Sequence, residues 1–241
     1  MLEKARGIVL CQIKYSESSL ILHLYTDRWG RTALMIPGAR SRSKGRRTSL
    51  YQPLSLLEID MHHKANRELH HARELRILHP FTSIPFDPAK SAVALFLADI
   101  LHRSLREEEA NAGLFEFISS SIQYLDLASA GMPNFHLHFM THLTRHLGFL
   151  PEKSLFTEMS WFDLRSGSFL SYRPEHGECL EPESADLLYR LLGISVDQLS
   201  TLHLNRHARN RLLEGVIRYY QLHLEGMPVI KSHEVLKQLF D

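Results

Sequence analysis

Thr32-Ala33-Leu34-Met35-Ile36 leads into Gly38-Ala39-Arg40-Ser41-Arg42-Ser43-Lys44-Gly45-Arg46-Arg47, and Leu54-Ser55-Leu56-Leu57-Glu58-Ile59 follows. The first and last runs are apolar and strand-like, whereas the middle run carries five positive charges and no acid. A basic, Gly/Ser-rich connection between two strands predicts a flexible cationic arm on a rigid sheet. Arginine and lysine bind phosphate, and the arginine fork can do so bidentately. The bare run is equally typical of a solvated surface loop.

The acid-free zone is wider than this connection. From Arg28 to Leu57 the chain has seven Lys/Arg and no Asp or Glu. Residues 1–80 hold 14 Lys/Arg against 7 Asp/Glu, a net charge of +7, while residues 81–241 hold 14 against 20, a net charge of −6. Such asymmetry indicates a basic binding module joined to an acidic body.

Length and cysteine content narrow the class of protein. The 241 residues suit one large domain or two small ones, and the 44% of apolar residues are enough for a core. Cys11 and Cys179 are too few for a disulfide framework or a four-cysteine zinc site. The sequence shows no N-terminal signal pattern, and no apolar run approaches the roughly 18 residues of a membrane span. We therefore expect a soluble, cytoplasmic protein.

The first 80 residues contain five strand-like segments, at 7–13, 20–25, 31–36, 53–61 and 69–78. Asp27-Arg28-Trp29-Gly30 reads as a hairpin turn in which the glycine can take positive φ. Five short strands without a long helix predict a small barrel. The oligonucleotide-binding (OB) barrel has this strand count and binds single strands with its open face and loops. The pattern alone does not separate it from an SH3-like barrel.

A proline-containing linker at 81–88 precedes a change to helical spacing. Apolar stripes predict helices within 93–105, 114–125, 139–147 and 212–224, with Asn205 as an N-cap, and Ser232 can cap a last short helix. The helical spacing stops between 151 and 182, where residues 161–172 read as an inserted hairpin. The predicted fold is thus α+β, with a five-stranded barrel domain at 1–80 and a helical domain at 81–241.

Histidine content raises the question of a metal. His138, His142 and His146 are four residues apart, and His62-His63 and His70-His71 are pairs. Zinc sites usually add cysteine or carboxylate ligands and a hydrogen-bond partner for each imidazole, and the sequence shows neither. Packing or surface histidines are the simpler interpretation. Motifs of the GxxxxGK[ST], HExxH and GxSxG types are absent from the sequence, so we expect no metal, no cofactor and no enzyme.

Binding of single-stranded DNA requires a cationic groove and rings on which bases stack. Tyr15 and Tyr25 are candidate rings, although Tyr25 fits the core equally well. The candidate DNA-binding residues are Arg28, Trp29, Arg31, Arg40, Arg42, Lys44, Arg46, Arg47 and Tyr51. The cations of the basic connection are expected to contact phosphates, which position DNA without reading its sequence.

Short motifs occur along the chain in a recognisable order. The barrel part has Gly7-Ile8-Val9-Leu10, Tyr15-Ser16-Glu17-Ser18-Ser19-Leu20, Thr26-Asp27-Arg28-Trp29-Gly30, Gly38-Ala39-Arg40 with Ser43-Lys44, and Leu50-Tyr51-Gln52-Pro53-Leu54. The helical part has Leu147-Gly148-Phe149-Leu150-Pro151, Arg211-Leu212-Leu213, His223-Leu224, Lys231-Ser232 and Val235-Leu236. In this order they resemble the bacterial recombination mediator family RecO, over most of the chain.

The resemblance implies an N-terminal OB domain, a C-terminal helical domain and a nucleoid-associated role in DNA repair without catalysis. Members of the family bind single-stranded and double-stranded DNA, anneal single strands and, with RecR, help RecA displace single-stranded DNA-binding protein. The helical domain of relatives can bind the acidic, apolar C-terminal tail of that protein. Such a tail needs a cation beside an apolar groove. The candidate cations are Arg103, Arg106, Arg145, Arg206 and Arg209.

The chain departs from the family pattern between residues 151 and 182. Many relatives carry a four-cysteine zinc ribbon there, whereas this chain has only Cys179. We therefore expect a hairpin around Trp161 and Phe169 that packs apolar side chains in place of a metal.

Two other functions remain open from the sequence. One is a protein–protein adaptor whose OB-like barrel binds a partner and whose basic connection is incidental. The other is a metal-dependent nuclease that uses the histidines. A steep salt dependence of DNA binding favours the mediator over the adaptor, and strand cleavage with added Mn²⁺ or Zn²⁺ favours the nuclease.

Overall fold

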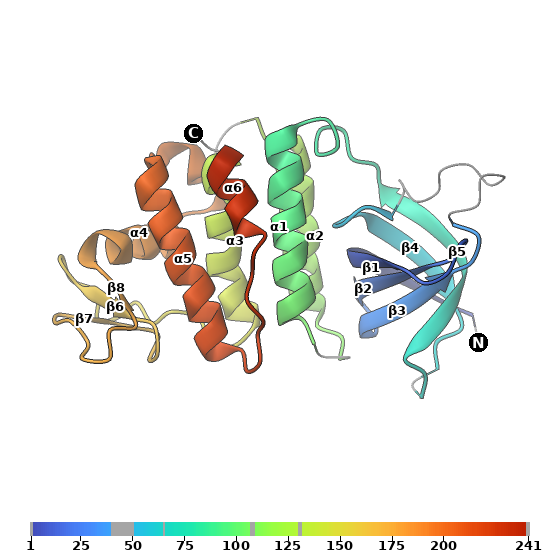
Figure 1. The fold of residues 1–241 in the computed structure, drawn as a ribbon, viewed down its shortest axis with the longest axis horizontal. Helices are drawn as coiled ribbons and strands as arrows, with labels where there is room; N and C mark the ends of the chain where they lie inside the picture. Colours follow the sequence, from blue (N-terminus) through green and yellow to red (C-terminus); the bar gives the residue numbers. More distant parts are fainter. Residues whose placement is uncertain (1, 40–50, 65, 107–108, 130–131, 240–241) are drawn as a thin grey trace. The chain divides into compact units, whose positions relative to one another are not determined.

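The computed structural model of the chain describes residues 2–39, 51–64, 66–106, 109–129 and 132–239 (Figure 1). The chain divides into two compact units, residues 1–127 and 128–241. The first unit contains the predicted OB domain together with the first two helices that follow it. The second unit contains the remaining helices and a small sheet.

Five strands form the barrel of the first unit: β1 (Glu3–Lys14), β2 (Leu20–Thr26), β3 (Gly30–Ile36), β4 (Leu56–Met61) and β5 (Leu69–His79). The barrel is closed in the order β1-β2-β3-β5-β4, with β3 and β5 parallel and the other pairs antiparallel. This confirms the predicted five-stranded barrel and is consistent with an OB fold. The fourth strand begins at Leu56, not at Pro53 as predicted. Leu54 has a φ of 67°, which a strand cannot accommodate.

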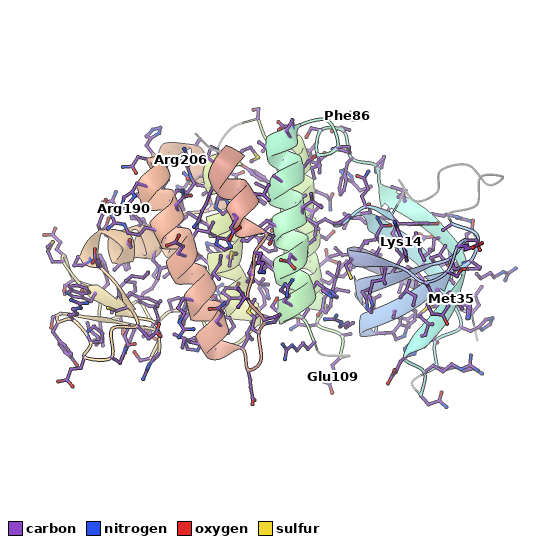
Figure 2. All side chains as sticks on the ribbon, in the orientation of Figure 1. Lys14, Met35, Phe86, Glu109, Arg190 and Arg206 are labelled. Atoms are coloured by element: carbon purple, nitrogen blue, oxygen red, sulfur yellow. The ribbon has the colours of Figure 1, made fainter. Side chains whose placement is uncertain are left out.

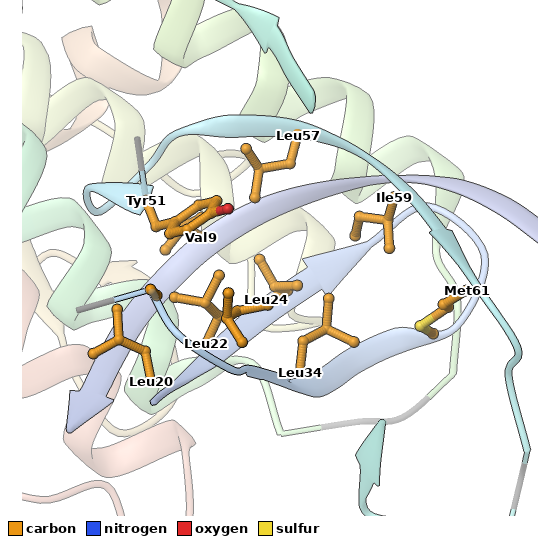
Figure 3. Packing of buried hydrophobic residues seen from close by; sticks show 11 residues of the cluster. Val9, Leu20, Leu22, Leu24, Leu34, Tyr51, Leu57, Ile59 and Met61 are labelled. Atoms are coloured by element: carbon orange, nitrogen blue, oxygen red, sulfur yellow. The ribbon is translucent and has the colours of Figure 1, made fainter. Parts of the chain in front are cut away.

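Alternation along the strands builds the barrel core. In β3, every second residue from Gly30 to Ile36 is buried, and β2 follows the same rule over most of its length. Figure 3 shows the inward side chains around Leu22, Leu24 and Leu34, with Tyr51 beside Val9. Ala39 and Tyr51, which bracket residues 40–50, both belong to this core cluster.

Two helices complete the first unit: α1 (Pro88–Ser104) and α2 (Ala112–Leu127). Asp87 caps α1 by accepting from the backbone N–H groups of Ala89 and Lys90, with Pro88 in the first turn. The preceding linker is held by the Asp126 carboxylate at the end of α2. That carboxylate accepts the backbone N–H groups of Thr82, Ser83 and Ile84 at 2.9–3.1 Å and the Thr82 hydroxyl at 3.0 Å.

The C-terminal end of α1 lies against the outer face of β1, β2 and β3. Cys11, His23 and Arg31, one from each strand, contact His102 of α1. The Arg31 guanidinium donates to the backbone carbonyls of His102 at 2.7 Å and Leu105 at 2.5 Å. OB barrels commonly bind oligonucleotides on the face of strands 2 and 3. In this chain His102 of α1 contacts one residue of each of these two strands, His23 and Arg31.

The second unit contains α3 (Met132–His146), α4 (Pro182–Gly193), the 3₁₀ helix η3 (Val196–Thr201), α5 (Arg206–His223) and α6 (His233–Leu239). Asn205 caps α5 by accepting from the Ala208 N–H at 2.8 Å, as predicted. Helix α4 was not predicted from the sequence. Its buried residues Ser184, Ala185, Leu188 and Leu191 do follow helical spacing, but two of them are too small to mark an apolar stripe.

The predicted hairpin is present as β6 (Trp161–Asp163) and β7 (Ser168–Leu170). A third strand, β8 (Cys179–Leu180), pairs with β6 and extends it to a sheet of order β7-β6-β8. Rings from this region pack on one another and on α4: Phe162 and Phe169 lie 4.9 Å apart, and Phe156 stacks on Tyr189 at 3.7 Å. This apolar packing around Trp161 and Phe169 is the arrangement predicted for residues 151–182 from the sequence.

Candidate nucleic-acid interface

The basic connection joins β3 to β4. Its five cations, Arg40, Arg42, Lys44, Arg46 and Arg47, lie outside the described residues. Its two stems are described: Ala39 is 2% exposed and Tyr51 is 6% exposed. Because both stems are held in the barrel core, the connection leaves and re-enters the barrel at the end where β3 finishes and β4 begins.

The opposite end of β3 carries the turn with Arg28 and Trp29. The Thr26 hydroxyl accepts from the Trp29 N–H at 3.0 Å and donates to the Gly30 carbonyl at 3.0 Å, and Gly30 has a φ of 59°. Arg28 is exposed, donates to the Lys4 carbonyl at 3.1 Å and lies over the indole of Trp29 at 6.0 Å. Trp29 is half-buried and packs against the edge of the core cluster.

Three rings stack in series next to this turn. The imidazole of His63 lies parallel to the indole of Trp29, with centroids 4.8 Å apart and an interplanar angle of 5°. His63 also stacks on His70, again at 4.8 Å, with an angle of 24°. His70 is only 5% exposed and hydrogen-bonds to the backbone of Arg67. Burial lowers the pKa of His70, with a further contribution from His63, so its ring is neutral at pH 7.

Arg31 has a different environment from the other candidate cations. Its guanidinium donates to two carbonyls at the end of α1 and to Nδ1 of His102 at 3.2 Å. Burial, helped by the charge of Arg31, lowers the pKa of His102 to about 4, so the imidazole is neutral at pH 7. Burial also raises the pKa of the neighbouring Cys11 thiol. This cluster attaches α1 to the barrel, which leaves few of the Arg31 donors for a phosphate.

The candidate rings differ in how accessible they are. Tyr25 is 2% exposed and Tyr51 is 6% exposed, so a base could stack on either only after the core had opened. Tyr15, in the turn after β1, is 61% exposed. Of the rings considered from the sequence, Tyr15 is therefore exposed, while Trp29 is half-buried with His63 stacked on its indole.

The sequence pattern did not reveal two cations near Trp29. Lys64 and Arg67 are exposed in the connection between β4 and β5, and the Arg67 N–H donates to the Lys64 carbonyl at 3.0 Å. Their position follows from the parallel pairing of β3 with β5, in which Ala33 lies opposite Leu69. The β2–β3 turn and the β4–β5 connection therefore share one end of the barrel. The charge pattern contains no information on this strand pairing, so it did not place Lys64 and Arg67 at the end of the barrel that carries Trp29.

The candidate tail-binding arginines are distributed over both units. In the first unit, Arg103 pairs with Asp99 at 2.5 Å and Arg106 is exposed. In the second unit Arg145 is exposed, and Arg206, labelled in Figure 2 near the start of α5, donates to the Lys237 carbonyl at 2.7 Å. Two of the five thus belong to the first unit and three to the second, and their joint role stays a prediction.

Arg209 is the member of this set that lines a pocket. It is 9% exposed and donates to Oδ1 of Asn134 at 3.2 Å and to the Leu204 carbonyl at 2.9 Å. The pocket has a volume of about 300 Å³, and Leu199 and Leu202 contribute apolar surface to it. Burial lowers the pKa of Arg209, which nevertheless stays cationic at pH 7 because guanidinium is such a weak acid. A buried cation next to apolar side chains suits a carboxylate with an apolar neighbour.

Two histidines of α3 bond to backbone groups of the second unit. His138 contacts the Ile194 carbonyl and His142 the Leu191 carbonyl through Nε2, each at 3.1 Å, at the end of α4. Burial lowers the pKa of His138 to about 4, and it also lowers the pKa of His142. The last carbonyls of a helix have no hydrogen-bond partner within the helix, so neutral imidazoles that donate to them stabilise the end of α4. Across the described residues, no three His, Cys, Asp or Glu side chains are grouped to hold a metal ion.

No helix within the described part of the chain combines the length and apolar composition needed to cross a bilayer.

Comparisons with known proteins cover the whole chain. The family model for Recombination protein O N terminal matches residues 1–81, and the model for Recombination protein O C terminal matches residues 85–233. The DNA repair protein RecO of Bacteroides fragilis is 39% identical over 242 residues, covering 100% of both chains. The proteins of the same name from Phocaeicola vulgatus and Christiangramia forsetii are 38% and 34% identical, again over 100% of both chains.

Proposed function

Since the chain belongs to the RecO family of DNA repair proteins, we propose that it is a recombination mediator that binds and anneals single-stranded DNA. We further propose that, with RecR, it helps RecA load on DNA covered by single-stranded DNA-binding protein. We also propose that the protein binds double-stranded DNA, which is the product of annealing. Because its ligands are DNA, it would act at the bacterial nucleoid.

One observation carries this proposal: a closed barrel whose β3–β4 connection lies in a segment of seven Lys/Arg without an acid. Both stems of that connection are anchored in the core. An anchored cationic segment can neutralise phosphates of two strands and lower their mutual repulsion. Such a mechanism needs no bond-making chemistry, so we propose that the protein is not an enzyme.

The test is a fluorescence-anisotropy titration of a labelled oligonucleotide at several salt concentrations. A variant in which Arg40, Arg42, Lys44, Arg46 and Arg47 are all Ala should bind every oligonucleotide more weakly. Its plot of log affinity against log salt should flatten by roughly 0.7 for each phosphate that the protein no longer neutralises. Arg190→Ala is the control, because Arg190 is an exposed cation paired with Asp186 on α4.

The same titration separates the mediator from the adaptor. An adaptor binds no oligonucleotide with a steep salt slope, and its five-Ala variant behaves like the wild type. An unchanged slope in a five-Ala variant that keeps its circular dichroism spectrum would place the DNA elsewhere.

For the partner tail, the pocket of Arg209 is the best placed of the five candidate positions. We propose that a peptide ending in acids and an apolar residue binds there with micromolar affinity. Calorimetry on the full chain should show binding that Arg209→Gln removes and Arg145→Gln, at an exposed position on α3, leaves intact. Absence of heat and of competition at high peptide concentration would exclude this pocket.

A further inference from the structure

The two cation-bearing segments of the barrel lie at opposite ends of the same strand. Trp29 immediately precedes Gly30, the first residue of β3, whereas the basic connection follows Ile36, the last. Seven extended residues span about 20 Å. β4 joins the same two ends of the barrel. Tyr51, at the end of the basic connection, precedes it, and His63, which stacks on Trp29, follows it.

The end that carries Trp29 has an organised interior. The indole, His63 and His70 form a continuous stack, and its innermost ring is buried. The turn hydrogen bonds of Thr26 fix the backbone of Trp29, and the bond to Arg67 fixes His70. A ring held in this way loses little conformational freedom when a ligand stacks on it, and such preorganisation favours binding.

Charge at this end suits a nucleic acid. Arg28, Lys64 and Arg67 are exposed cations at this end. Lys4 of β1 is exposed there as well, but it lies 3.5 Å from Glu58 and 4.0 Å from Asp60. Asp27, the acid next to Arg28, is already paired with Arg6 at 2.9 Å, while Glu3 lies 3.9 Å from Arg28 and Glu68 follows Arg67 in the chain. The Arg28 guanidinium already lies over the indole. Aromatic rings and guanidinium planes are the two surfaces on which proteins stack unpaired bases.

We propose that Trp29, His63 and His70 form a base-stacking platform, and that it gives the barrel a second contact for single-stranded nucleic acid, separate from the basic connection. In this arrangement Trp29 touches the base, and His63 is a positioning residue that holds the indole in place. The proposal rests on the proposed function. It adds that one barrel contacts nucleic acid at two ends, once at this platform and once through the basic connection that follows β3.

The two tryptophans of the chain allow a direct test, because Trp29 and Trp161 are in different units. Trp161→Phe leaves Trp29 as the only indole, and its fluorescence should be quenched when the full chain is titrated with oligothymidylate. Trp29→Phe leaves Trp161 as the matched control, whose emission should not change. An unchanged emission from Trp29, while anisotropy shows that the oligonucleotide is bound, overturns the proposal and leaves the proposed function standing.

Substitution of His63 tests the positioning role. Trp29→Ala should weaken binding about 5- to 150-fold with the salt slope retained, as expected when one stacked base is released. His63→Ala should weaken it in the same direction, and His63→Phe, which keeps a stacking ring, should restore it. Equal affinities for wild type and a folded His63→Ala variant refute the platform.

The five-Ala variant of the basic connection completes the design. It should still quench Trp29 at higher oligonucleotide concentration, because the platform is at the other end of β3. Loss of all quenching at saturation refutes two separate contacts. If the wild-type protein binds no oligonucleotide at any salt concentration, the proposed function fails and this inference fails with it.

Discussion

Protonating or replacing the Asp126 carboxylate should release the linker between the barrel and α1. The side chain of Asp126 is fully buried and accepts three consecutive backbone N–H groups, from Thr82, Ser83 and Ile84. Lys90, also buried, adds a bond from its ammonium group to the Asp126 carbonyl at 2.9 Å. These bonds join the linker, α1 and α2 within the first unit.

The magnitude follows from the pKa of this carboxyl. Burial alone would raise it, but the N–H groups of Ile84, Thr82 and Ser83 outweigh burial and lower it from 3.8 to about 2. The folded state therefore prefers the ionised form. That preference stabilises the fold by about 2 kcal/mol well above the ordinary carboxyl pKa, by about half as much at about pH 3, and by little at about pH 2. Stability is lost as pH falls through the folded pKa.

Asp126→Asn tests this reasoning, because it keeps the size of the side chain and removes its charge. Urea unfolding of the first unit should show the variant to be less stable than wild type by about 2–3 kcal/mol at pH 7, and by about half as much at pH 3. Hydrogen exchange at the amides of Thr82, Ser83 and Ile84 should speed up in the variant. Asp186→Asn is the control, since Asp186 is 40% exposed and its surface pair with Arg190 is worth under about 1 kcal/mol.

Two outcomes would refute the argument. One is a stability difference between wild type and Asp126→Asn that is the same at pH 7 and pH 3. The other is unchanged exchange at the three amides, which would mean that the carboxylate does not hold the linker.

Gly167→Ala should destabilise the second unit by about 2–3 kcal/mol in thermal unfolding, because φ is +70° and the new Cβ would lie 2.5 Å from the Tyr219 hydroxyl. Gly177→Ala, with φ +74° and no atom within 4 Å of its Cβ, should cost only about 1 kcal/mol, and equal costs would argue against the clash. Arg31→Met should lower the stability of the first unit by about 2–3 kcal/mol, because two helix-end carbonyls lose a charged donor, and should leave the salt slope of DNA binding nearly unchanged. Arg28→Met should flatten the salt slope of DNA binding and leave the stability of the first unit nearly unchanged. A large change of the salt slope in Arg31→Met would show that Arg31 contacts phosphate instead.

The barrel was predictable because its signals are local. Inward and outward residues alternate along each strand, and turn residues such as Gly30 separate the strands. The N-cap at Asn205 and the inserted hairpin were equally visible, since each depends on residues a few positions apart. Helix α4 was not, because small residues such as Ser184 and Ala185 form part of its buried face.

The candidate site was predictable only in part. The sequence identified the acid-free segment and the ring of Trp29. It did not identify His63, Lys64 and Arg67 as neighbours of Trp29, because that proximity depends on the parallel pairing of β3 with β5. The charge pattern also grouped Arg31 with the other cations, although its donors bond to the end of α1.

By itself, the sequence determined the barrel strands and most of the helices, where the positive charge concentrates and which family the chain resembles. These properties depend on periodicity and on the order of motifs, which are written along the chain. For the candidate cations and rings that the structure describes, only the tertiary structure decided which face solvent and which hold the fold together. Arg31 and Tyr51 have the same side chains as surface ligands of DNA, but α1 and the barrel core surround them. That difference comes from contacts between residues far apart in sequence, and composition and spacing carry no record of such contacts.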